Sequence, residues 1–350
     1  INVDYKTRTV EIEGITLKEG DFISLNGTTG EVYKGKVETK AAEVSGDFAA
    51  LMDLCNKYTK LNVRTNADTP HDAEVARAFG ASGIGLCRTE HMFFDAEKIV
   101  AMREMILSPD VEGRRKALAK LLPFQKADFK GIFKAMDGCP VNVRLLDPPL
   151  HEFVPHDAKG QEEMAKAMGV TVQEIKKRVE SLCEHNPMLG HRGCRLGNTY
   201  PEITEMQTQA ILGAAIELKK EGYDPHPEIM VPLTGILYEF EAQEKVIRDA
   251  AAALFEKEGM EIPFKVGTMI EIPRAALTAN RIASRAEYFS FGTNDLTQMT
   301  FGYSRDDIAS FLPVYLEKKI LKVDPFQVLD QNGVGQLIEM AVDKGRSVRP

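Results

Sequence analysis

The chain has 350 residues and a net charge of −8, with 43% hydrophobic and 27% charged residues, a composition typical of one large folded domain or two smaller ones. No run of like charges provides a basic face, so nucleic acid is not an expected partner. No apolar stretch approaches the ~18–20 residues of a membrane helix, and no signal peptide opens the chain. Five scattered cysteines without C-x-x-C spacing favour a reducing, cytoplasmic location.

The first part of the chain has the pattern of a small β module. Residues 1–36 alternate in strand fashion, and the Asn-Gly and Thr-Gly pairs in "DFISLNGTTGEVYKG" predict hairpin turns. Residues 38–59 carry apolar side chains at helical spacing, which predicts a connecting helix. We therefore expect a β-rich segment at 1–37, a linker helix at 38–59 and a larger domain at 60–350.

After residue 60, short apolar strands alternate with longer helical segments. The predicted strands are 61–67, 83–89, 141–147, 193–197, 228–233, 264–272 and 288–294. This pattern predicts a parallel sheet covered on both faces, and the α/β architecture that fits is a (β/α)8 TIM-type barrel. A doubly wound sheet is the alternative, but no G-x-G-x-x-G follows the first strand. Because an eighth strand is not found and the chain does not begin with Met, a fragment truncated before strand 8 is expected.

Three arginines stand at or beside the ends of predicted strands. In a barrel the active site lies at the C-terminal ends of the strands, so Arg88, Arg144 and Arg192 are candidates for one site. Their planar donor groups suit phosphate or carboxylate ligands. The alternative is structural ion pairing with nearby acids such as Glu90 and Asp147.

Two carboxylates lie at the ends of the sixth and seventh predicted strands. Glu271 and Asp295 lie one strand–helix–strand step apart, so both point to the same edge of the sheet. Two neighbouring carboxylates repel unless they share a proton or a cation, and Mg²⁺ accepts two protein ligands together with water and substrate oxygens. A salt-bridged pair is the alternative. Asn294 either donates an amide hydrogen bond to substrate or caps a helix that begins at Asp295.

Five further residues near these strand ends are interpreted as structural. Arg195 lies two residues inside the predicted fourth strand, and Cys87 and Cys194 also fall within predicted strands. His91 and His191 are expected to be hydrogen-bonded structural histidines.

Five longer stretches carry a resemblance to a known family. They are "GIGLCRTEHMFF" (83–94), "VNVRLLDPPLHEF" (141–153), "NPMLGHRGCRLG" (186–197), "GTMIEIPRAALTA" (267–279) and "FSFGTNDLTQMTFGYSRDD" (289–307). In this order they resemble the phosphoenolpyruvate (PEP)-binding barrel of the pyruvate, phosphate dikinases, a branch of the PEP-utilising enzymes. "GDFISLNGTTGEVYKG" resembles the end of that family's phosphohistidine domain.

The resemblance implies a role for each candidate residue. Arg88, Arg144 and Arg192 would be catalytic and hold the phosphoryl group and neighbouring oxygens. Glu271 and Asp295 would bind Mg²⁺. The substrate-binding set implied is Arg88, Arg144, Arg192, Glu271, Gly292, Thr293, Asn294 and Asp295.

The resemblance also implies partners and a reaction. A phosphohistidine on a separate swivelling domain would exchange its phosphoryl group with PEP and pyruvate, an ATP-binding domain would charge the histidine, and the protein would be a homodimer. The family's Thr-x-His histidine, its nucleotide domain and the Cys of its "CGEHGG" loop have no match here, so this chain is expected to be inactive alone. A pyruvate, water dikinase, a Mg²⁺-dependent 2-oxo-acid lyase or aldolase, and a non-catalytic docking module are the alternatives.

Overall fold

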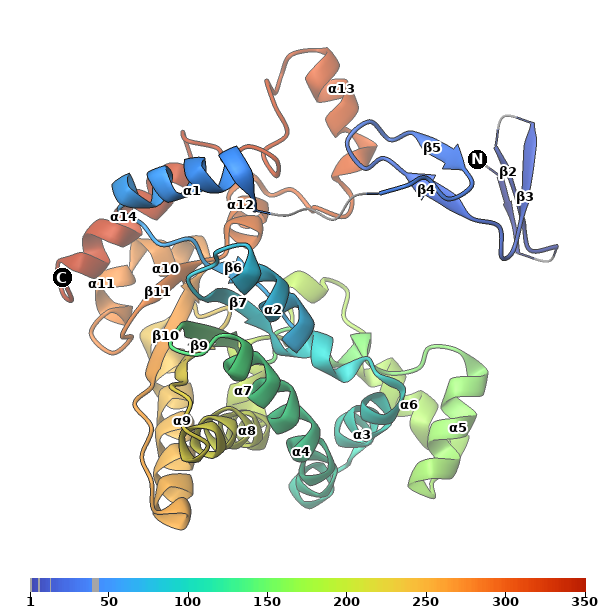
Figure 1. Ribbon diagram of the computed structural model, residues 1–350. Coiled ribbons are helices and arrows are strands. Elements are labelled where there is room, and N and C mark those ends of the chain that lie inside the picture. Colours follow the sequence, from blue (N-terminus) through green and yellow to red (C-terminus); the bar gives the residue numbers. More distant parts are fainter. Residues whose placement is uncertain (1, 6, 13, 40–43) are drawn as a thin grey trace. The chain divides into compact units, whose positions relative to one another are not determined.

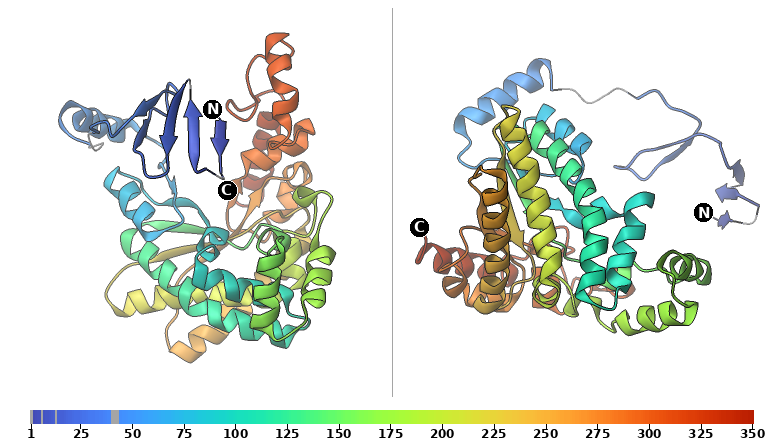
Figure 2. Two further views of the ribbon diagram at one scale, coloured as in Figure 1. Left: turned by 90° about the vertical axis from the view of Figure 1, so that its right-hand side faces the viewer. Right: turned by 90° about the horizontal axis from the view of Figure 1, so that it is seen from below.

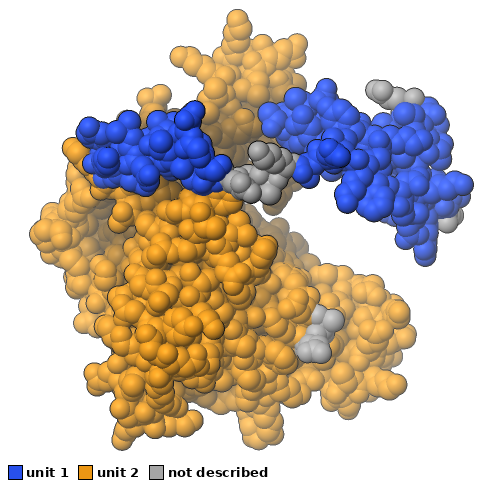
Figure 3. Space-filling view, viewed as in Figure 1, with its two compact units in different colours: residues 1–59 blue, residues 60–350 orange. Residues whose placement is uncertain are grey.

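The computed structural model describes every residue except 1, 6, 13 and 40–43. The chain divides into two compact units, residues 1–59 and residues 60–350, which Figure 3 colours separately.

The first unit contains short antiparallel strands and one helix. Strands β1 (Asn2–Asp4), β2 (Thr9–Ile12) and β3 (Ile15–Lys18) form one sheet, and β4 (Ile23–Leu25) and β5 (Val32–Lys34) form a hairpin. The turn of this hairpin is held by Asn26, whose carbonyl accepts from the Gly30 amide at 2.8 Å, as the Asn-Gly signal predicted. Helix α1 (Gly46–Tyr58) lies in the segment predicted as a linker helix, of which residues 40–43 are outside the described residues.

The second unit is built on a sheet of six parallel strands in sequence order (Figure 1). The strands are β6 (Thr65–Asn66), β7 (Ile84–Arg88), β8 (Pro140–Arg144), β9 (His226–Val231), β10 (Lys265–Ile270) and β11 (Phe289–Phe291). Each strand pairs in parallel with the strand before it. This curled sheet surrounded by helices is a partial TIM-type barrel, which confirms the predicted fold class.

Helices follow each strand. They are α2 (Pro70–Ala78), η1 (Thr89–Phe93), α3 (Ala96–Leu107), α4 (Val111–Ala135), η2 (Leu150–Glu152), α5 (Ala158–Met168), α6 (Val172–Leu182), η3 (Pro187–Leu189), α7 (Cys194–Thr199), α8 (Pro201–Lys220), α9 (Leu237–Glu258), α10 (Pro273–Leu277), α11 (Ala279–Ile282), α12 (Thr293–Phe301), η4 (Ile308–Ser310), α13 (Leu312–Glu317) and α14 (Val334–Arg346). The long helices α4, α8 and α9 pack side by side (Figure 2). In the described part of the chain, none of the helices has the length and apolarity needed to cross a bilayer.

Two of the predicted strands differ from the structure. Residues 193–197 form most of helix α7, and of the predicted strand 61–67 only Thr65–Asn66 pairs with a neighbour. A short apolar run does not distinguish a strand from one buried helical turn. Here the Gly193 and Cys194 amides bond to the carbonyls of Asp147 and Pro232, which lie in loops after β8 and β9. The described sheet therefore has six strands where seven were predicted.

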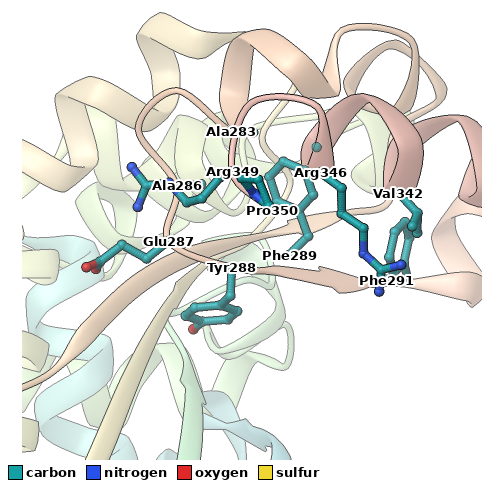
Figure 4. A pocket seen from close by; sticks show the side chains of 11 residues that line it. Ala283, Ala286, Glu287, Tyr288, Phe289, Phe291, Val342, Arg346, Arg349 and Pro350 are labelled. Atoms are coloured by element: carbon teal, nitrogen blue, oxygen red, sulfur yellow. The ribbon is translucent and has the colours of Figure 1, made fainter.

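The outer edge of the sheet, at β11, is flanked by an apolar pocket of about 250 Å³ (Figure 4). Phe289 and Phe291 of β11 line it together with Val342 of α14. On the other side of the same strand end, the Tyr288 ring points into the sheet's interior (Figure 4). Its hydroxyl donates to Asn142 Oδ1 at 2.9 Å, and Asn142 Nδ2 donates to the Gly85 carbonyl at 3.0 Å.

This row of contacts ties together strands that are not neighbours. Tyr288 precedes β11, Asn142 lies on β8 and Gly85 lies on β7, so two strands intervene between tyrosine and asparagine. The Tyr288 ring covers Gly267 of β10 on the way. The burial of Tyr288 raises the pKa of its hydroxyl well above the ordinary value, so the group stays a neutral donor. The tie therefore joins the start of β11 to β8 across the two strands between them.

We expect Tyr288→Phe to lower the free energy of unfolding by about 1–2 kcal/mol, because the buried Asn142 oxygen loses its donor. Urea denaturation of the two proteins measures the difference. Tyr238→Phe is the matched control, since Tyr238 is 75% exposed on α9. An unchanged midpoint for Tyr288→Phe would show that the tie does not contribute to stability.

Candidate active site

Arg88 and Arg144 are the last residues of neighbouring strands β7 and β8. They are direct register partners across the parallel pair, so their side chains leave the sheet next to each other. This is the C-terminal edge of the barrel, where the sequence placed the candidate site.

Arg88 is held by an aspartate that follows the first strand. Asp68 Oδ2 accepts from Arg88 Nε at 3.1 Å and from Nη2 at 2.8 Å, and Asp68 Oδ1 accepts from the Arg88 amide at 2.7 Å. His91 Nδ1 contacts the same carboxylate at 2.8 Å, as expected of a structural histidine. Asp68 is 8% exposed, so it holds the Arg88 guanidinium from its buried side. The Arg88 side chain is 37% exposed and keeps a side open to solvent.

Arg144 and Arg192 belong to one continuous chain of alternating charges. Arg144 donates from Nη2 to Glu90 and from Nη1 to Asp147 Oδ2 at 3.1 Å. Arg192 donates to Asp147 Oδ2 at 2.5 Å and to Asp295 Oδ2 at 3.2 Å. The carboxylate of Asp147 is thus shared between two guanidinium groups, and the chain ends on one of the two predicted metal ligands.

The electrostatics of this chain keep both arginines charged. Burial opposes the charge of Arg144, but Asp147, Glu90 and Glu271 outweigh it and raise its pKa above the ordinary value. For Arg192, burial is likewise outweighed by Asp147 and Asp295. Each of the two arginine side chains is 12% exposed, so these are largely buried cations stabilised by buried anions.

Glu271 directly follows β10 and is almost fully buried. Its Oε1 accepts from the Leu233 amide at 2.6 Å. Burial, with Asp147 and Asp295 adding to it, raises the pKa of Glu271 to about 8, although Arg144 and the Leu233 amide oppose the shift. The ionised form of Glu271 is therefore disfavoured mainly by burial and further by the two neighbouring carboxylates.

The loop after β11 brings Asp295 to the same edge. Gly292 precedes helix α12, and a Cβ at this position would lie 2.5 Å from Glu271 Oε2, so only glycine permits the close approach. Asp295 lies in the first turn of α12, and its Oδ1 accepts from Gln298 at 3.2 Å. Thr293 and Asn294 are exposed. Because the helix begins at Thr293, Asn294 is not its cap, and the capping alternative is wrong.

The donor set fits a hard cation such as Mg²⁺. Among the described residues no group of three or more His, Cys, Asp or Glu side chains is arranged to hold a metal. A site of only two carboxylates, Glu271 and Asp295, leaves the remaining positions to water and ligand oxygens, as Mg²⁺ prefers. A cation would also relieve the repulsion that raises the Glu271 pKa.

Comparisons with known proteins were made on the whole chain. The family model of the PEP-utilising enzyme, PEP-binding domain, matches residues 42–349. The chain belongs to the family of PEP-utilising enzymes. A pyruvate, phosphate dikinase of Clostridium symbiosum is 56% identical over 351 residues, which is 100% of this chain and 40% of that protein. One of Giardia intestinalis is 57% identical over 347 residues, 99% of this chain and 39% of that protein.

The match extends to plants. Pyruvate, phosphate dikinase 1, chloroplastic, of Arabidopsis thaliana is 55% identical over 352 residues, which is 100% of this chain and 37% of that protein. The chain therefore spans about 40% of the length of these relatives. The family resemblance expected from the sequence motifs is confirmed.

Sequence reasoning missed three groups at the site. Asp68 lies two residues after β6 and directly after the predicted strand 61–67, so it could have been found by reading the end of that strand as the others were read. Gln298 lies one helical turn after Asp295 and contacts it. The Leu233 amide, which bonds Glu271, is a backbone group in a loop and has no sequence signal.

A pocket of about 960 Å³ opens beside the candidate site. Arg192 and Gln298 line it, together with the loop at Pro148–Pro149 and Tyr303 after α12. It offers a path from solvent to the Arg192 end of the charge chain.

Proposed function

We propose that residues 60–350 bind PEP and pyruvate with Mg²⁺ and form the PEP/pyruvate half of a pyruvate, phosphate dikinase. The whole protein would convert ATP, pyruvate and phosphate to AMP, PEP and diphosphate through a phosphohistidine on a separate domain. The relatives of that name and the family match support this proposal.

One observation about the arginines carries the proposal. Arg88 and Arg192 each retain one donor nitrogen, Nη1, with no hydrogen-bond partner among the described residues. Their other side-chain nitrogens are bonded to carboxylates. Nε of Arg144 also lacks a partner there but is buried, so Arg144 contributes its charge and not a spare donor. Two oriented guanidinium groups with spare donors beside a third buried cation favour a ligand rich in anionic oxygens such as a phosphoryl group.

The side chains would act together during transfer. Arg88 and Arg192 would hold the phosphoryl oxygens, and Arg144 would stabilise the negative charge that passes between donor and acceptor oxygens. Asn294, exposed beside Asp295, would donate its amide to a substrate oxygen. Gly292 and Thr293 would line the substrate at the start of α12. The preformed ion pairs keep these groups oriented before the ligand arrives.

Glu271 and Asp295 would hold the metal. Bound Mg²⁺ would polarise the oxygens of pyruvate and favour its enolate form. The residues themselves would set where that cation sits, through the Leu233 amide on Glu271 and Gln298 on Asp295.

Other parts of the whole protein are proposed as partners. The phosphohistidine domain, of which residues 1–37 would be the C-terminal end, and an ATP-binding domain would supply the phosphoryl group, and the assembly would be a homodimer. On this proposal residues 38–59 are the linker between domains. The described cysteines are all free thiols, which supports a reducing compartment such as the cytoplasm.

Calorimetry with oxalate, a planar mimic of the pyruvate enolate, tests the site. We expect binding that requires Mg²⁺, because both the carboxylates and the arginines are in place. Binding of equal strength without Mg²⁺ would contradict the metal assignment, and no binding with Mg²⁺ would contradict the site.

We expect Arg88→Ala to weaken Mg²⁺-dependent oxalate binding at least about tenfold, since a charge-assisted contact is worth ~1.5–3 kcal/mol. The fold should change little, because the Arg88 side chain is 37% exposed. Thermal melting checks the fold. Arg77→Ala is the matched control, as the Arg77 side chain on α2 bonds the Ala81 carbonyl and no carboxylate among the described residues. Wild-type affinity in Arg88→Ala would remove this residue from the site.

A further inference from the structure

The segment that delivers Arg192 to the site is a loop without regular structure between η3 and α7. Its course from residue 189 to residue 192 determines whether the guanidinium reaches both Asp147 and Asp295. Two side chains outside the proposed ligand site hold this loop from different directions.

The first is Arg195. Its Nη1 donates to the Leu189 carbonyl at 2.8 Å and to the Gly190 carbonyl at 2.9 Å. The three site arginines all pair with carboxylates, whereas Arg195 forms no ion pair with any residue that the structure describes. The Arg195 guanidinium therefore interacts with backbone carbonyls of the loop. The Gly190 carbonyl also accepts from the Arg192 amide at 3.1 Å, so Arg195 acts on the oxygen that anchors Arg192.

The second is Glu184, which lies two residues after the end of α6. Its Oε1 accepts from the His191 amide at 2.7 Å. Its Oε2 is buried with no hydrogen-bond partner among the described residues. This oxygen lies against Gly190, where an added Cβ would come within 1.6 Å of it. A larger residue at 190 would push Glu184 away and release the His191 amide.

Together, the contact of Arg195 with the Gly190 carbonyl and that of Glu184 with the His191 amide hold the backbone around His191, which precedes Arg192. At the C-terminal end of the loop, the Gly193 amide donates to the Asp147 carbonyl at 2.9 Å. An error of about 1 Å in the placement of a binding group can cost up to ~100-fold in function. Contacts that restrict this backbone therefore have a direct effect on the guanidinium.

We infer that Arg195 and Glu184 are positioning residues, which hold the 189–192 backbone so that Arg192 bridges Asp147 and Asp295 and presents its remaining donor to the ligand. This inference rests on the proposed function, because it assigns the two residues a role in binding through Arg192. Arg195 does not touch the ligand site itself.

A double-mutant cycle on the full chain tests it. We expect Arg195→Met to weaken Mg²⁺-dependent oxalate binding about tenfold, and to have no further effect in an Arg192→Ala background. A merely structural role would lower affinity equally in both backgrounds, and that result, or wild-type affinity in Arg195→Met, would overturn the inference. Arg77→Met is the control, because Arg77 likewise bonds a backbone carbonyl, after α2.

Glu184 offers a test by conservative replacement. Glu184→Gln keeps an oxygen that accepts from the His191 amide and should bind oxalate as the wild type does. Glu184→Ala removes that acceptor and should lose affinity to the same extent as Arg195→Met. Equal affinities for the Gln and Ala variants would overturn the role of Glu184.

Hydrogen–deuterium exchange without ligand separates this inference from the proposed function. We expect faster exchange at the amides of residues 191–193 in Arg195→Met and in Glu184→Ala than in wild type or Arg77→Met. If wild type fails to bind oxalate but exchange rises as expected, the proposed function fails and the loop assignment stands. Unchanged exchange in both variants overturns the inference whatever the binding result.

Discussion

Glu271→Gln is expected to stabilise the metal-free protein while it abolishes Mg²⁺-dependent oxalate binding. The carboxyl is buried near Asp147 and Asp295, and its pKa is raised to about 8. A neutral amide avoids this repulsion and still accepts from the Leu233 amide through its oxygen. At pH 8 and low salt, we expect the free energy of unfolding to rise by about 1–3 kcal/mol.

The sign of this stability change follows from the protons that the folded and unfolded chains bind. Between the ordinary pKa of a Glu carboxyl and about 8, the folded wild type holds a proton at Glu271 that the unfolded chain has lost. Wild-type stability from this group is therefore full below about pH 4.5 and falls as pH rises toward 8. In Glu271→Gln that fall should be absent. Oxalate binding by the wild type should strengthen over the same range, since the metal displaces the proton.

Denaturation midpoints from pH 5 to 8.5, with chelator present, measure the effect. Glu162→Gln is the control, because Glu162 is exposed on α5 and should leave both stability and binding unchanged. A Glu271→Gln protein that is less stable than wild type at pH 8, or that still binds oxalate with Mg²⁺, would contradict the assignment.

Arg144→Met is expected to have the largest effect on folding. Arg144 neutralises Glu90 and Asp147, whose side chains are 7% and 3% exposed. Removing one partner of a buried ion pair leaves uncompensated charge and typically costs about 3–5 kcal/mol. Methionine fills much of the same volume, so the loss reports charge more than packing.

Urea denaturation at neutral pH measures this loss. Arg88→Met is the comparison, because Arg88 is 37% exposed and its buried partner Asp68 keeps a contact with His91 Nδ1 at 2.8 Å. We expect a much smaller change there. Similar losses in the two variants would show that the charge chain through Asp147 is not a main support of this edge of the sheet.

The sequence predicted the architecture well where strands are long and continuously apolar. Strands β9 and β10 are buried at every position but the first, and the polar residues that end or follow β7, β8 and β10 could be read directly from the chain. It failed at residues 193–197, where Gly193, Cys194 and Leu196 are buried but in a helical turn. A five-residue apolar run has too few positions to distinguish helical periodicity from strand periodicity.

The candidate residues were found by position, but their partners were not. Asp147 was considered only as an alternative ion-pair partner, yet it joins Arg144 and Arg192. Such sharing depends on how two loops, after β8 and before α7, meet in space. Asp68 and Gln298 were missed although both have a sequence signal, since Asp68 follows the predicted strand 61–67 and Gln298 lies one helical turn after Asp295.

The hydrogen bond from Tyr288 to Asn142 joins the start of β11 to β8. Arg144 ends β8, and the residues after β11 lead to Asp295. The distance between those two groups is therefore set inside the sheet, below the surface that a ligand would meet. A ligand that bridges them need not bend the sheet, so little of its binding free energy is lost to ordering the protein. Association is expected to be a single fast phase, limited by desolvation of the charged side chains and not by a rearrangement of the barrel.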